Sequence, residues 1–97
     1  FWTVHPGVDP VELLRRYPDR WRLMHIKDMA EGIPTGDFSG GAPAEAQVVV
    51  GTGQIDMAAV LAAAEEVGVE KYYVEDETTD PIGNIPLTLQ YLQTITY

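Results

Sequence analysis

The side chains best suited to chemistry stand at the ends of two short apolar stretches. His25, Lys27 and Asp28 close the first stretch, and Glu75, Asp76 and Glu77 close the second. Neutral imidazole and carboxylate oxygen are ligands for divalent Mn, Co, Zn or Mg, and such ions polarise substrate oxygens. A carboxylate near a polarised carbonyl can accept the proton of the adjacent carbon. The two ends therefore contain the residue types of a metal-assisted proton-transfer site.

Strand alternation separates the candidates within each stretch. If both stretches are extended, one face carries Trp21, Leu23, His25 and Lys27 in the first, and Tyr73, Glu75 and Glu77 in the second. The opposite face then carries Arg22, Met24 and Ile26, and Val74 and Asp76. A buried histidine bonded to the backbone and a solvated acidic run are the structural alternatives for these residues.

Lys27 and Asp28 each have two interpretations. Lys27 lies one pleat beyond His25, where its ammonium group would orient a substrate oxygen or stabilise an enolate charge. A salt bridge to a neighbouring acid explains it equally well. Asp28 would hold the ring of His25 or cap the following loop, and we favour the structural role.

Helix signals lie between and after the two strand-like stretches. Asp9-Pro10 predicts a short helix, because Asp caps a helix start and Pro suits the first helical position. Asp56 predicts a helix from about Met57 to Val67, which Gly68 ends. Asp80-Pro81 predicts a last helix to about Ile95, with Ile85, Leu89 and Leu92 on one face. Pro86 would either kink that helix or move its start to about Asn84.

The remaining segments complete an alternating α/β order. Residues 1–4 are apolar and resemble the tail of a strand, and residues 21–26 and 71–76 are the other two strands. Residues 29–46 hold several Gly and Pro and predict a long loop, of the kind that often covers an active site. A β-α-β-loop-α-β-α order favours a right-handed unit of parallel strands. Active sites of such folds lie at the carboxyl ends of the strands.

Size and charge narrow the functional classes. With 97 residues, the chain is at most one small domain. Its 15 Asp and Glu against 6 Lys and Arg give a net charge of −9, which disfavours nucleic-acid binding. There is no apolar run long enough for a membrane span, and no cysteine for disulfides or Cys-ligated zinc. Because the chain opens on a strand tail, we expect a piece of a larger protein or a chain that self-associates to close its sheet.

Four motifs in this order resemble the end of a known family. They are His25-Ile26-Lys27-Asp28, Gly51-Thr52-Gly53-Gln54-Ile55-Asp56, Tyr73-Val74-Glu75 and Asp80-Pro81. Together they resemble the sugar phosphate isomerase/epimerase family of xylose isomerase-like TIM barrels. The resemblance covers nearly all of residues 1–97 and implies strands six to eight of a (β/α)8 barrel with their helices. The implied fold class is therefore α/β, a parallel β-α-β-α-β-α segment.

The resemblance implies a site and a reaction. The family binds a divalent metal through Glu, Asp, His and Glu at the barrel mouth; His25 matches the histidine and Glu75 the last glutamate. Trp2 matches a position that often contacts the sugar, although a packing role suits it equally. The implied activity is isomerisation or epimerisation of a sugar or keto-sugar through an ene-diolate, with Glu75 as one proton-transfer group and Lys27 at the substrate. The other two ligands are not in this chain, so the isolated chain is expected to bind metal weakly and to be inactive.

Three alternatives stay open beside this assignment. A metal-dependent dehydratase or lyase of the same barrel family would share the enolisation step. An inactive, self-associating barrel fragment would explain an incomplete ligand set. The Gly51-Thr52-Gly53 turn could cradle a phosphate, but a lone glycine pair before a helix is weak evidence and a plain turn is favoured. His5, which precedes a proline, is expected to be an ordinary loop residue.

Overall fold

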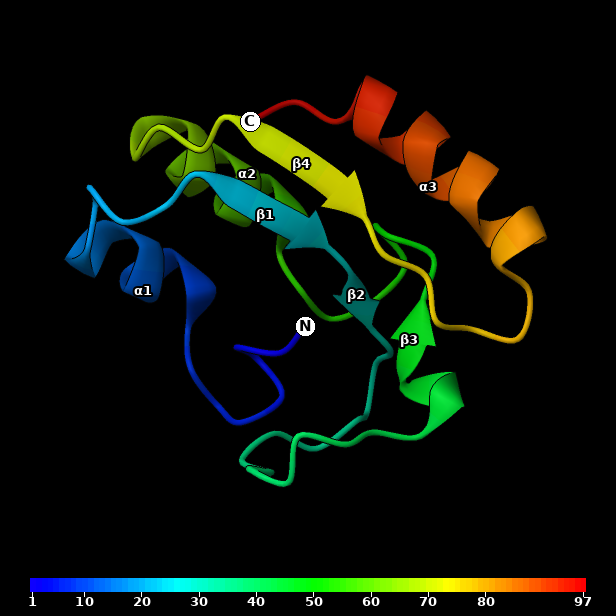
Figure 1. The fold of residues 1–97 in the computed structure, drawn as a ribbon. Coiled ribbons are helices and arrows are strands. Elements are labelled where there is room, and N and C mark those ends of the chain that lie inside the picture. Colours follow the sequence, from blue (N-terminus) through cyan, green and yellow to red (C-terminus); the bar gives the residue numbers. More distant parts are fainter.

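A computed structural model describes residues 1–97. Its elements in chain order are α1 (Pro10–Arg16), β1 (Leu23–Ile26), β2 (Asp28–Met29), the 3-10 turn η1 (Ala44–Ala46), β3 (Gln47–Val48), α2 (Met57–Glu66), β4 (Lys71–Val74) and α3 (Pro81–Thr94). β1 pairs in parallel with β4, and β2 pairs antiparallel with β3 (Figure 1). The chain is thus an α/β domain with three helices and a two-stranded parallel sheet. None of the helices combines the length and apolar character that crossing a bilayer requires.

All three helices begin at the predicted caps. The side chains of Asp9, Asp56 and Asp80 accept hydrogen bonds from the backbone N–H groups of Val11, Ala59 and Gly83. These acceptors satisfy amides that have no partner inside the helix. Gly68 follows the end of α2 with a φ of 85°, a left-handed conformation that favours glycine.

α3 is a single helix although it contains Pro86. It begins at Pro81, so the alternative start near Asn84 is wrong. The predicted apolar face is also partly wrong, because Leu89 is exposed. Thr88 is buried on the packed side instead, where its hydroxyl accepts the N–H of Val50 at 3.1 Å.

The expected strand tail at residues 1–4 does not form. Residues 2–7 are a turn, in which the N–H of His5 donates to the carbonyl of Phe1 at 2.9 Å and that of Gly7 to Val4 at 2.8 Å. These local bonds use backbone groups that a strand would give to a ladder. Of the three expected parallel strands, therefore, only β1 and β4 are present.

β1 is also shorter than expected at its start. The strand begins at Leu23, so alternation does not extend back to Trp21. Trp21 packs against the core, and its indole N–H donates to the carbonyl of Leu14 at 3.0 Å. Trp21 is therefore not on the His25 face, and the indole anchors α1 to the start of the strand.

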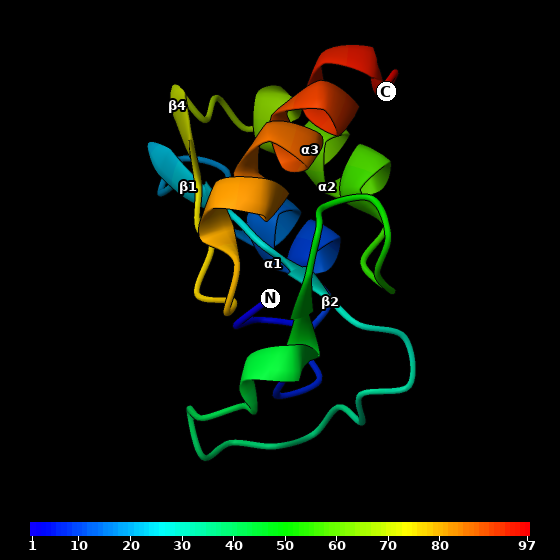
Figure 2. The ribbon, with the colours of Figure 1, turned by 90° about the vertical axis from the view of Figure 1, so that its right-hand side faces the viewer.

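The two faces of the β1–β4 pair differ in their surroundings. The helices lie behind the strands, and the edge-on view shows the opposite face uncovered (Figures 1 and 2). Ile26 of β1 is buried with Met57, Val60 and Leu61 of α2, as apolar burial favours. Leu23 is 57% exposed. The face shared by Leu23 and His25 is thus open to approach, and it is the face on which the polar strand ends meet.

The Asp56 cap can be tested by substitution. Asp56→Ala removes the acceptor for Ala59 N–H, so the free energy of unfolding should fall by about 0.5–2 kcal/mol. Urea denaturation followed by circular dichroism measures it. Asp56→Ser keeps a capping oxygen and should stay close to the unsubstituted chain. Equal stability of Asp56→Ala and Asp56→Ser would contradict the role of Asp56 as the N-cap of α2.

Candidate functional site

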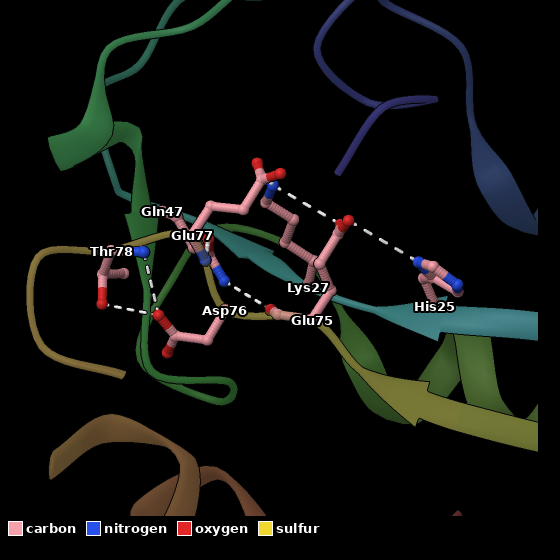
Figure 3. A network of polar contacts seen from close by, with 7 residues as sticks. All are labelled: His25, Lys27, Gln47, Glu75, Asp76, Glu77 and Thr78. Carbon is pink, nitrogen blue, oxygen red and sulfur yellow. Dashed lines mark hydrogen bonds and ion pairs between the residues drawn. The ribbon is translucent and has the colours of Figure 1, made fainter. Parts of the chain in front are cut away.

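His25 and Glu75 come together across the parallel strands. The register pairs His25 with Tyr73 and Ile26 with Val74, and the N–H of Glu75 continues the ladder by donating to Ile26 O at 3.0 Å. Parallel strands about 4.8 Å apart direct side chains of equal parity to the same face. The Nδ1 atom of His25 lies 3.6 Å from Oε1 of Glu75 (Figure 3). The His25 side chain is 65% exposed and that of Glu75 28% exposed, so both remain accessible to a small molecule.

Lys27 is buried beside Glu75. Its side chain is only 4% exposed, and its Nζ lies 2.6 Å from Oε2 of Glu77 and 3.5 Å from Oε2 of Glu75 (Figure 3). A buried ammonium group needs such partners, because leaving water without them is costly. The salt-bridge interpretation of Lys27 therefore describes what its side chain does in this structure.

Trp2 and Phe1 form an aromatic wall over Lys27. The ring centroids lie 5.1 Å and 5.0 Å from Nζ, within the range of a cation–π interaction. The two rings meet edge to face with centroids 4.7 Å apart. Trp2, one of the sequence-predicted substrate contacts, thus lies with Lys27 at the same site.

A cavity of about 230 Å³ adjoins these residues. Trp2, His25, Lys27 and Glu75 are among the residues that line it, together with mostly apolar side chains of α1, β1 and α2. The structure therefore brings all four sequence-predicted site residues to one pocket.

Gln47 is a site residue that the sequence analysis missed. Its Nε2 donates to the carbonyl of Glu75 at 2.6 Å, and its Oε1 accepts the N–H of Glu77 at 2.8 Å (Figure 3). The residue is only 8% exposed. The one available signal was a polar amide opening an otherwise apolar stretch, and nothing local pointed to residues 75–77.

Asp28 serves the fold rather than His25. It is fully buried, and its carboxylate accepts the N–H groups of Met29, Gly51, Gly53 and Ile55 at 2.8–3.3 Å. This is one of the two structural roles that the sequence analysis left open for Asp28, and it differs from the other, which was to hold the ring of His25. The N–H groups of Gly51 and Gly53 therefore already donate to a carboxylate of the chain itself. This opposes the alternative that the turn binds a phosphate.

His5 is more than an ordinary loop residue. It is buried, and its carbonyl accepts the N–H groups of Gly36 and Asp37 at 2.8 Å and 3.2 Å. Its ring stacks on Phe1 with centroids 5.8 Å apart. His5 lies in a turn, as expected, and it also ties this first turn to the long loop.

One pKa value near this turn departs from its ordinary value. The pKa of Asp37 falls below 3.8 chiefly because Ser39 N–H donates to its carboxylate. The carboxylate of Asp37 is therefore charged throughout the neutral range and faces His5 at 3.9 Å.

The His25–Glu75 pair fits two positions of a metal site but not a whole site. Two ligands at about 2.1 Å from one tetrahedral ion stand about 3.4 Å apart, close to the 3.6 Å between Nδ1 and Oε1. Imidazole and carboxylate are a donor set that suits Mn, Co, Zn or Mg. Nowhere in the chain do three or more His, Asp or Glu side chains gather in a way that could hold a metal ion. A complete site would need ligands from elsewhere.

Comparison with known proteins gives no identity. No family model, no curated protein and no solved structure matches this chain. The resemblance to sugar isomerases stays a prediction, and the function has to be argued from the site.

Asp28 can be tested with a matched substitution. Asp28→Asn replaces one accepting oxygen by an NH2 group that would face N–H donors, so we expect a loss of about 2–4 kcal/mol in the free energy of unfolding. Chemical denaturation measures the loss. Asp19→Asn, at an exposed turn, should change stability by less than about 0.5 kcal/mol. A similarly small effect at Asp28 would show that its four contacts do not hold the turn.

Proposed function

We propose that residues 1–97 are the closing segment of a TIM barrel in a metal-dependent sugar or keto-sugar isomerase or epimerase. The observation that carries the proposal is the approach of His25 and Glu75 to 3.6 Å at the carboxyl ends of parallel strands. Catalytic groups of α/β barrels gather at that edge. The uncovered face of β1 and β4 would be the inner face of the barrel.

Each side chain of the pocket has a role in this proposal. His25 and Glu75 would hold a divalent cation together with ligands from the rest of the barrel. When bound, the cation supplies Lewis-acid polarisation of a substrate carbonyl and its neighbouring hydroxyl. Glu75 accepts the proton from the carbon beside the carbonyl, and a second carboxylate outside this chain completes the transfer. Trp2 packs on the carbon face of the sugar.

Lys27 would balance charge during this transfer. Before the reaction, its ammonium group is shared between Glu77 at 2.6 Å and Glu75 at 3.5 Å. When Glu75 takes up a proton it becomes neutral, and Lys27 keeps Glu77 as its anionic partner. The positive charge then faces the negative charge that develops on the substrate oxygen, which stabilises an ene-diolate.

The activity test applies to a protein that contains this segment and the rest of the barrel. Removing divalent metal with a chelator should lower the isomerisation rate by more than about 100-fold, since the metal supplies several kcal/mol. His25→Ala and Glu75→Ala should cause a similar loss while the circular dichroism spectrum is kept. Chromatography of the products from a panel of keto-sugars distinguishes an isomerase from a dehydratase or lyase. Full isomerisation in the metal-free protein would refute the proposal.

A second candidate, an inactive module that self-associates, is favoured by the edge of β1. β1 has β4 as its only strand neighbour, so one of its edges offers unpaired backbone groups. Leu23 on the same strand presents apolar surface to solvent. Pairing of this edge with a second copy would bury both features.

Sedimentation velocity tests this second candidate. We expect the 97-residue chain to sediment as a dimer or larger species, and Leu23→Lys to shift it toward the monomer, because a charged edge opposes pairing. Ile82→Lys is the matched control, since Ile82 is also an exposed apolar residue but lies on α3. A monomer at every concentration, or equal effects of the two substitutions, would exclude β1 as the association edge.

A further inference from the structure

Gln47 holds the backbone that carries Glu75 and Glu77. Its side chain reaches from β3 to the chain beyond β4, where it donates to Glu75 O at 2.6 Å and accepts from Glu77 N–H at 2.8 Å. A carboxamide has one donor and one acceptor group, as a peptide unit has. In a parallel ladder, one residue bonds to the carbonyl of one neighbour and the N–H of the residue two further on. Gln47 therefore pairs with residues 75 and 77 as a neighbouring strand residue would, beyond Val74, the last residue of β4.

Glu75 is consequently fixed from both sides of its backbone. Its N–H donates to Ile26 of β1 at 3.0 Å, and its carbonyl accepts from Gln47. With the backbone fixed, the side chain is directed to the uncovered face, between His25 at 3.6 Å and Lys27 at 3.5 Å. The same amide fixes Glu77, which makes the shortest contact to Lys27.

Gln47 is itself held firmly. It pairs with Met29 in the β2–β3 ladder, and its N–H donates to the carbonyl of Ala44, the first residue of η1. Met29 is fully buried, and Ala30 N–H adds a bond to Ala46 O at 2.8 Å. β2 and the end of the long loop thus both hold Gln47, the residue whose side chain bonds to residues 75–77.

We infer that Gln47 is a positioning residue that sets the distance of Glu75 and Glu77 from Lys27 and His25. The inference rests on the proposed function for its catalytic meaning, while the geometry it invokes is testable without activity. Gln47 does not line the 230 Å³ cavity, and its amide contacts backbone atoms of Glu75 and Glu77, so its effect passes through the backbone of residues 75–77.

The test compares the two lysines of the chain, Lys27 and Lys71. Lys27 is buried and held by Glu77, whereas Lys71 is exposed. Brief acetylation followed by peptide mass spectrometry gives the ratio of modification at Lys27 to that at Lys71. In Gln47→Ala this ratio should rise several-fold, because Glu77 no longer has a fixed place beside the ammonium group. Gln47→Met, which keeps the length of the side chain, should give the same rise if the alanine variant folds poorly.

Gln54 offers a matched control. Its Nε2 also donates to backbone carbonyls, those of Ala30 and Ile33 at 2.8 Å and 3.0 Å, but away from residues 75–77. Gln54→Ala should leave the acetylation ratio unchanged. Asp56→Ala controls for a general loss of stability and should also leave it unchanged. A ratio that is unaltered in both Gln47 variants, or raised equally in the controls, would overturn the inference.

A titration with Mn²⁺, followed by NMR, tests the proposed metal site separately from the role of Gln47. In the unsubstituted chain, added Mn²⁺ should broaden the imidazole proton signals of His25 selectively, and Glu75→Ala should remove that selectivity. The broadening per added Mn²⁺ should fall about tenfold in Gln47→Ala, as is common when a group supporting a metal ligand is lost. Absence of selective broadening in the unsubstituted chain would count against the metal site alone, and the acetylation ratio would still decide the role of Gln47.

Discussion

The buried carboxylate of Asp28 connects the strand that carries His25 to the turn that leads into α2. It accepts N–H groups from positions 29, 51, 53 and 55, so the segment from residue 51 to residue 55 is held by one side chain. The fit is close: a Cβ on Gly53 would lie 2.5 Å from Oδ1 of Asp28 and 2.2 Å from Met29 O. Gly51, with a φ of 95°, completes the turn against Tyr91 of α3. A carboxylate and two glycines thereby hold the turn that connects β3 to α2.

Gln47 depends on that arrangement. The β2–β3 pair exists because the chain returns past Asp28, which is itself paired with Val48 in the ladder. Once Gln47 has been brought beside Met29, its amide reaches residues 75–77 and orders them. The position of residues 75–77 thus depends on Gln47, and the position of Gln47 depends on Asp28. Both use polar groups that are almost fully buried, where an unpaired donor or acceptor would be costly.

The features that the sequence predicted are those that short stretches determine. Helix caps at Asp9, Asp56 and Asp80 depend on a few neighbouring residues, and strand parity places His25 and Glu75 on one face once the two strands pair in parallel in the observed register. The features that it missed depend on distant partners. Glu77 bonds to a side chain 30 positions away, and Gly53 to one 25 positions away. The hydrophobic periodicity of a sequence does not indicate which distant residues will contact each other. Residues 1–4 have strand-like composition, but the turn at His5-Pro6-Gly7 satisfies their backbone locally and the strand does not form.

The charges of the site explain why its acids can stand so close together. Glu75 and Glu77 share one buried ammonium group, and the remaining oxygen of Glu75 faces the imidazole of His25. Two carboxylates that bind the same ammonium group repel each other, and the positive charge of Lys27 offsets this repulsion. Burial of Lys27 beneath Phe1 and Trp2 keeps water from screening this attraction. Every contact in this arrangement lies within the 97 residues. Under the proposed function, the chain therefore orders its own share of the barrel mouth before the remaining ligands are supplied.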